Sequence, residues 1–191
     1  MAPIRLPLIP QERFTPEQQA LVAAISSGPR GQFKMSGPFY CYLHAPGFGE
    51  LAQQLGAHCR FGTSIPPRLS EFAILVTAQH WKSHYEWAAH APIAEKQGVK
   101  PETIRDLQAG RPPKKAPKDE LAIYAFVKEL YRDKRVSDRT YKSVNALLGD
   151  SGTVEFVGLL GYYAMVAMTL DVFRMPVPEG TPLPFAEPAI H

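Results

Sequence analysis

The sequence predicts an all-α fold, and three features of the 191-residue chain carry that prediction. Apolar residues recur at helical spacing along most of the chain, no stretch alternates apolar and polar residues with a period of two, and Pro, Ser or Gly stands at most expected helix ends. We therefore expect a bundle of about seven or eight helices forming a single domain over residues 1–191. A proline-rich tail should occupy residues 175–191.

The N-terminal part predicts two helices separated by an irregular segment. Residues 14–31 contain the first helix, with Thr15 as N-cap and Gly28 at its end. Residues 31–47 are rich in Gly, Pro and aromatic residues and predict an irregular segment. Residues 48–62 predict the second helix, which ends at the terminal glycine of that range.

The middle of the chain predicts a buried helix followed by two shorter ones. Residues 64–81 are apolar through most of their length, which is typical of a helix in the centre of a core. Residues 83–99 predict a helix in which Ser83 is the N-cap and Glu86 has capping-box spacing from it. A short helix is expected over residues 100–110.

The C-terminal part predicts three more helices. Residues 118–135 form an amphipathic helix, and residues 137–150 form a helix capped by Ser137 and ended by Gly149. Residues 151–173 form a long apolar helix, whose uncharged run of 15 residues is shorter than the roughly 20 that span a bilayer. The expected apolar face of the amphipathic helix consists of Leu121, Tyr124, Ala125, Val127 and Leu130.

Charge and cysteine usage exclude several classes of function. The net charge is +3, and no expected helix carries a stripe of Lys and Arg, so nucleic-acid binding is not expected. Cys41 and Cys59 fit no metal-binding or Cys-x-x-Cys spacing, which favours reduced core thiols. The N-terminus lacks the apolar core of a signal peptide. We expect a soluble cytoplasmic protein that binds neither nucleic acid nor membrane.

The stretch "QHWKSHYEWAAH", residues 79–90, concentrates the polar and aromatic residues that carry chemistry. On a helix Glu86 and His90 lie one turn apart, so the carboxylate can orient the imidazole by a hydrogen bond for general acid/base catalysis. Trp81 and Tyr85 would contribute to an apolar surround.

Two other interpretations of this stretch stay open. A metal site would need a third ligand from elsewhere, for which Glu71 is the best candidate, because the His-Glu-x-x-His pattern is absent. Alternatively, Glu86 and His90 form a solvent-exposed pair with no catalytic role.

Residues 66–99, "PPRLSEFAILVTAQHWKSHYEWAAHAPIAEKQGV", resemble the core segment of the carboxymuconolactone decarboxylase family, which shares its fold with the alkylhydroperoxidase D-like proteins. The similarity extends more loosely upstream and downstream. It implies an all-α homo-oligomer, a homotrimer or homohexamer, with its site near subunit contacts.

The thiol-dependent branch of this fold carries a Glu, a Cys-x-x-Cys motif and a His. Glu71 and His90 match the first and last of these, but the two cysteine positions hold Ser83 and Glu86. Peroxide reduction by a dithiol needs a thiolate nucleophile and a resolving thiol. We therefore reject a dithiol peroxidase function.

The decarboxylase branch keeps a Glu four residues before the His, and Glu86 and His90 match that pair. Its members often have a histidine directly before this Glu, where this chain has Tyr85. The resemblance implies a cofactor-independent decarboxylase or lyase acting on a small organic acid or lactone, with Glu86, His90, Tyr85 and Glu71 as catalytic residues and no metal.

Substrate binding is assigned to Arg68, Trp81 and Ser83, because the guanidinium of Arg68 can hold a carboxylate at two points. If residues 64–99 formed one continuous helix, Glu71 and Glu86 would lie about 22 Å apart. Their meeting requires a sharp break near Ser83 or a second subunit. The alternatives are a metal-assisted lyase or hydrolase using both glutamates and His90, and a non-catalytic oligomeric binding protein.

Overall fold

The computed structural model describes residues 3–187, and within this range the chain forms eight α-helices and no β-strand, which confirms the predicted all-α class. The helices are α1 (Pro16–Ser27), α2 (Gly37–Tyr42), α3 (Pro46–Ala57), α4 (Pro67–Trp81), α5 (His84–Lys96), α6 (Pro101–Gln108), α7 (Lys118–Asp133) and α8 (Asp138–Phe173). A π-helical turn, η2 (His58–Gly62), extends α3, and a 3-10 turn, η1 (Gln11–Arg13), precedes α1. The predicted tail contains no helix over residues 175–187, and its last four residues lie outside the described range.

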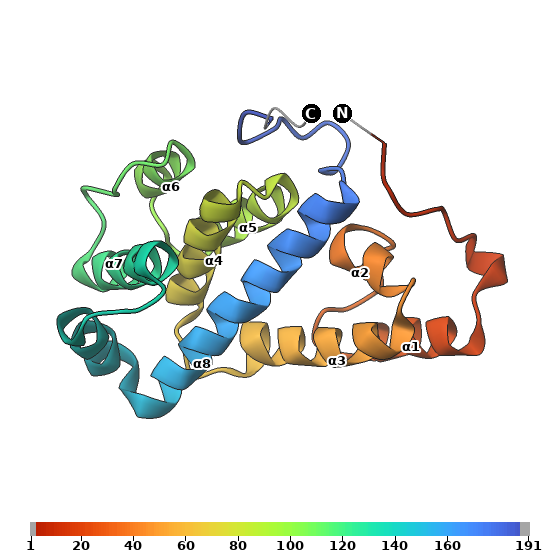
Figure 1. The fold of residues 1–191 in the computed structure, drawn as a ribbon, viewed down its shortest axis with the longest axis horizontal. Coiled ribbons are helices and arrows are strands. Elements are labelled where there is room, and N and C mark those ends of the chain that lie inside the picture. The colour runs from red at the N-terminus through yellow and green to blue at the C-terminus, as the bar shows by residue number, and fades with distance from the viewer. Residues whose placement is uncertain (1–2, 188–191) are drawn as a thin grey trace.

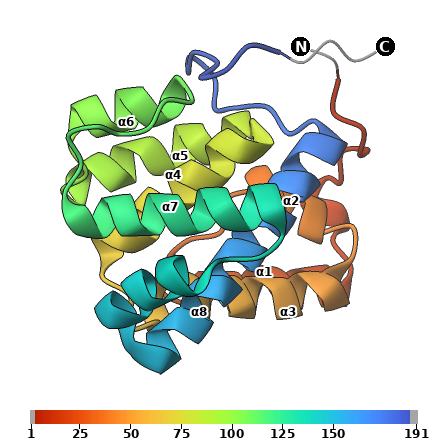
Figure 2. The same ribbon diagram turned by 60° about the vertical axis from the view of Figure 1, so that its left-hand side comes forward.

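Helix α4 lies at the centre of the molecule. Every residue from Leu69 to Ala78 is buried, so the helix has no solvent-exposed side along ten consecutive positions. Helices α5, α7 and α8 pack around it (Figures 1 and 2). This burial confirms the prediction of a core helix and explains why its sequence is apolar all round.

The chain reverses direction between α4 and α5. Lys82 adopts a left-handed conformation with φ 56°, and its backbone N–H donates to the carbonyls of the last turn of α4. Ser83 follows as the N-cap of α5, but its side chain makes no capping hydrogen bond, so the predicted capping box with Glu86 is wrong. The reversal lays α5 back along α4, which brings residues far apart in the sequence together.

Helices α1, α2 and α3 build a second apolar cluster next to α8 (Figure 1). The prediction of an irregular segment over residues 31–47 was wrong in part, because α2 forms within it. Gly37 and Pro38 begin this short helix, and Tyr40 and Tyr42 are buried by it. The buried members of the second cluster are Phe14, Leu21, Ile25, Tyr42, Leu43 and Ala52.

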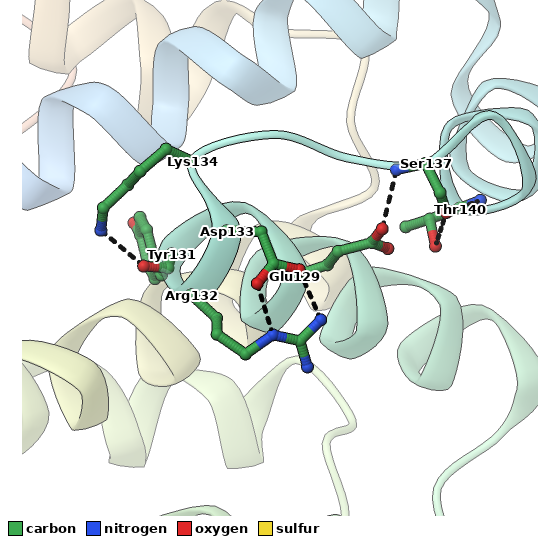
Figure 3. Close-up of polar contacts among 7 residues, drawn as sticks. All are labelled: Glu129, Tyr131, Arg132, Asp133, Lys134, Ser137 and Thr140. Atoms are coloured by element: carbon green, nitrogen blue, oxygen red, sulfur yellow. Dashed lines mark hydrogen bonds and ion pairs between the residues drawn. The ribbon is translucent and has the colours of Figure 1, made fainter.

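The connection between α7 and α8 is held by polar contacts that Figure 3 shows. Lys134 ends α7 in a left-handed conformation, and the carboxylate of Glu129 accepts a hydrogen bond of 2.7 Å from the backbone N–H of Ser137. The Ser137 hydroxyl in turn accepts from the backbone N–H of Thr140, as predicted for an N-cap. Helix α8 bends at Gly149, which has a non-helical φ of 69°, so its two segments match the two helices expected from the sequence.

The buried face of α7 agrees only in part with the predicted one: Val127 is buried and Tyr124 and Leu130 pack against the core, whereas Ala125 is exposed. Ile123, Phe126 and Val127 are fully buried between α7 and its neighbours, whereas Leu121 is 38% exposed. Apolar residues occupy more than one face of this helix. The sequence pattern therefore did not determine which face of α7 is buried. The contacts of α7 with α4 and α8 determine that face.

Helix α8 is long and apolar enough to cross a membrane by length and composition, with a mean hydropathy of 1.6 over its most apolar window. In the structure 44% of that window is buried inside the protein, because α8 packs on α2, α4 and α7. A core helix of a soluble protein passes the same test, so the fold is compatible with a soluble protein.

Candidate functional site

A pocket of about 270 Å³ lies among α2, α5, α8, the turn η2 and the loop between α1 and α2. Its volume is slightly below the roughly 300 Å³ at which pockets for drug-sized ligands begin, so its ligand must be small. Aromatic side chains and polar groups share its wall. The polar residues that line it include Arg30, Lys34, Arg60, Tyr85, Glu86 and His90, and the aromatic residues are Phe33, Phe39, Tyr162 and Tyr163.

Glu71 and His90 form the central hydrogen bond of the site. Glu71 Oε2 lies 2.7 Å from His90 Nδ1, and both side chains are buried. When Glu71 is ionised its carboxylate can only accept, so the hydrogen bond then comes from Nδ1–H of His90 and leaves Nε2 for a substrate. The contact joins α4 to α5 within one chain. Of the two arrangements that the sequence left open, the sharp break between the helices is the one observed.

Two further residues hold this pair in place. The ring of Tyr163 from α8 packs edge-on against the imidazole of His90, with 5.1 Å between ring centroids. Arg60, from the π-helical turn, has its Nε 3.9 Å from Glu71 Oε1 and supplies a positive charge beside the carboxylate. π-Helical turns are rare in proteins, and those that occur often lie at functional sites. Here the turn η2 supplies a pocket residue, Arg60.

Glu86 lies in the pocket wall as an unpaired carboxyl group. Its side chain is buried, at 2% exposure, and neither carboxyl oxygen has a hydrogen-bond partner among residues 3–187. Burial raises the pKa of Glu86 well above its usual range, and the negative charge of Asp171 raises it further. Burial therefore favours the neutral carboxylic acid form of Glu86.

This geometry corrects two expectations about Glu86 and His90. The hydrogen bond that orients His90 comes from Glu71 and not from Glu86, which makes none. The pair is also not solvent-exposed, because His90 has 8% of its surface exposed and Glu86 has 2%. The reason is that one side of α5 is covered by α4, so polar residues on that side are buried.

Tyr85 lines the pocket and contacts the loop between α1 and α2. Its hydroxyl donates to Ser36 Oγ over 3.1 Å. The phenol ring lies against Gly37, where a Cβ atom would stand 2.6 Å from the ring and where φ is +58°. A glycine is needed at that position for both reasons. The structure thus gives Tyr85 a contact that holds the loop.

The three residues assigned to substrate binding lie outside the pocket lining. The guanidinium of Arg68 is paired with Asp119 and Glu120 at the start of α7, so it is not available to a substrate in the pocket. Trp81 is partly exposed at the end of α4, and Ser83 is buried in the turn that follows. The expectation that Arg68 binds substrate is wrong, because Asp119 and Glu120 neutralise its charge. These two residues are about fifty positions away in the sequence, and no local pattern indicates the contact.

Sequence reasoning missed the positive side chains of the pocket. Arg30 and Lys34 come from the loop after α1, and Arg60 comes from the turn after α3. Neither segment carries a recognisable motif, and no helical spacing predicts that a loop arginine turns inward. Among residues 3–187 no group of three or more His, Cys, Asp or Glu side chains is placed to hold a metal ion.

A scan of the chain against protein-family models found no match, and a search of curated proteins found none.

Proposed function

We propose that the protein is a cofactor-independent acid/base enzyme, a decarboxylase or other carbon–carbon lyase acting on a small organic acid or lactone. One observation carries the proposal: the buried, unpaired carboxyl group of Glu86 and the imidazole of His90, oriented by Glu71, line the same small pocket. Two titratable groups in such different environments are suited to different steps of a proton transfer. The resemblance to carboxymuconolactone decarboxylases supplies the reaction class.

In a decarboxylation the bond between the carboxyl carbon and its neighbour breaks, carbon dioxide leaves, and the electron pair passes into an enolate or dienolate. The neutral carboxyl of Glu86 donates a hydrogen bond to the oxygen on which negative charge develops. The imidazolium of His90 then delivers a proton to carbon and is reprotonated from solvent. Glu71 keeps the reactive Nε2 of His90 directed away from α4 throughout.

The contacts of the possible metal ligands do not favour the metal-assisted alternative. Glu71 is engaged by His90 Nδ1 and lies beside Arg60, so its oxygens already have positive or donor partners. Elemental analysis of the purified protein tests the point directly. A stoichiometric transition metal would favour a metal-assisted lyase or hydrolase over our proposal.

We also propose that the protein is a cytoplasmic homo-oligomer, a homotrimer or homohexamer. Support comes from an exposed apolar stripe on α8. Its residues are spaced alternately by four and three positions, the spacing with which helices pack against one another. The stripe consists of Val154, Gly158, Gly161, Met165, Met168 and Val172, of which Met165 is only half-buried.

The function is tested by incubating the protein with a panel of muconolactones and β-keto acids. Release of carbon dioxide measures the turnover of each compound. We expect at least one substrate to turn over, His90→Ala to reduce kcat by about 10²- to 10⁴-fold, and Glu86→Ala, which removes the hydrogen-bond donor, to reduce it by about 10²- to 10³-fold. Glu95→Gln is the matched control, because Glu95 is exposed on the same helix and lies outside the pocket. Full activity in both site variants would refute the assignment, and no turnover across the panel would favour a non-catalytic binding protein.

A further inference from the structure

The guanidinium of Arg30 contains buried N–H donors that have no hydrogen-bond partner among residues 3–187. Arg30 follows α1 in the turn "GPRG" and lines the pocket. Its Nε and Nη2 atoms are these donors. Buried donors on a charged group are costly to leave unpaired, so the guanidinium keeps a capacity for hydrogen bonding that an anion entering the pocket would satisfy.

The surroundings of Arg30 hold the guanidinium in place without neutralising it. Its Cζ lies 5.3 Å from the ring centroid of Phe39 on α2 and 5.9 Å from that of Phe61 on η2. Aromatic rings at such distances attract a cation but leave its charge and its N–H donors free. On the third side the guanidinium approaches α3, because a Cβ atom at Gly56 would stand only 2.6 Å from Arg30 Nη2. The guanidinium is thus positioned before any ligand binds.

The charges around the pocket favour an anion. Arg30, Lys34 and Arg60 line it, and of these Arg60 alone lies beside a carboxylate, that of Glu71. Burial raises the pKa of Glu86 well above its usual range, which disfavours a negative charge on its carboxyl group. The pocket therefore carries an excess of positive charge inside an aromatic wall, which suits a small planar molecule that carries a carboxylate.

We infer that Arg30 determines specificity by binding the carboxylate of a small planar, unsaturated or aromatic acid, whose remaining atoms lie toward Glu86 and His90. A guanidinium presents two parallel N–H donors that match the two oxygens of a carboxylate. This inference rests on the proposed function for the reaction at the far end of the ligand. Binding of the carboxylate itself depends only on Arg30 and its surroundings.

Calorimetric titration of the full chain with benzoate, an unreactive planar carboxylate, tests the inference, with benzamide and inorganic phosphate as comparison probes. We expect benzoate to bind and Arg30→Gln to weaken it about 10- to 100-fold, while Arg105→Gln on the exposed surface of α6 leaves it unchanged. Benzamide should bind weakly and equally to the wild type and to Arg30→Gln. Thermal denaturation of each variant verifies that it is folded.

Three outcomes overturn the inference: no benzoate binding, equal affinity of Arg30→Gln and wild type, or phosphate binding more tightly than benzoate at Arg30. A failure of the proposed function is distinguishable from these. If Glu86→Gln and the wild type bind benzoate alike through Arg30 but no acid in the panel turns over, the carboxylate site stands and the enzyme assignment falls.

Discussion

Glu71 and His90 lie in contact across two helices, with Oε2 and Nδ1 2.7 Å apart, although they are nineteen positions apart in the sequence. The nearer glutamate, Glu86, lies one helical turn from His90 but forms no hydrogen bond. The two carboxyl groups therefore have separate tasks. Glu71 orients the imidazole, and Glu86 is a buried carboxyl group in the pocket wall whose pKa lies well above its usual range.

Glu71→Gln should reduce kcat by about 10²-fold or more while changing KM little, because the amide neither fixes the tautomer of His90 nor stabilises its imidazolium. The measurement is steady-state kinetics on whichever acid in the panel turns over. The Glu95→Gln variant serves as the control for loss of an exposed carboxylate. An unchanged kcat in Glu71→Gln would show that the hydrogen bond is structural only.

The burial of Glu86 predicts how stability depends on pH. In the unfolded chain this group titrates at about pH 4.3, and in the folded protein its pKa is well above its usual range. The folded state thus binds the proton more tightly. The resulting stability is fully present below about pH 4.3 and is lost as the pH rises toward the folded pKa, by about 1.4 kcal/mol per pH unit.

Glu86→Gln removes this titration. Its free energy of unfolding should therefore rise relative to that of the wild type as the pH increases from about 4.3. Urea denaturation at several pH values measures the difference, and Glu95→Gln should keep the slope of the wild type. A constant difference between Glu86→Gln and the wild type at all pH values would contradict a neutral, buried Glu86.

Tyr85→Phe separates a catalytic role of this residue from a role in holding the loop. Because its hydroxyl donates to Ser36, we expect the variant to lose about 0.5–1.5 kcal/mol of stability. Its kcat should fall by less than about tenfold, whereas the loss of an acid/base group should lower kcat by about 10²-fold or more. A larger loss of kcat with unchanged stability would identify Tyr85 as a proton donor.

The sequence predicted most helices because their ends carry strong local signals. Thr15 and Ser137 cap the helices expected of them, and Gly149 bends the chain where a helix end was predicted. Helix α2 escaped prediction because a six-residue helix has few positions for a periodic pattern, and its buried tyrosines are fixed by tertiary packing.

The site was predictable only where a motif or helical spacing marked it. Glu86 and His90 were identified from their spacing, and Glu71 as a candidate metal ligand and then from the resemblance, but no local pattern shows which glutamate contacts the imidazole. Which glutamate contacts His90 depends on the chain reversal at Lys82. A lysine in the sequence does not indicate the left-handed backbone conformation that this reversal requires. Arg30 reaches the pocket through a loop, so its position follows from contacts that are distant in the sequence.

The exposed stripe of α8 predicts self-association that a single charge should disrupt. Val154 is 74% exposed and Met168 is 43% exposed, so in an oligomer each would bury apolar surface. Met168→Asp should convert the oligomer to a monomer, because an unpaired carboxylate in an apolar interface costs several kcal/mol.

Light scattering coupled to size-exclusion chromatography measures the mass of each form. Leu121→Asp is a matched control, because Leu121 is an apolar residue of similar exposure, 38%, on α7. We expect this control to keep the mass of the wild type. A wild-type protein that elutes as a monomer at all concentrations, or a Met168→Asp variant that keeps the oligomeric mass, would show that the α8 stripe is not the contact between subunits.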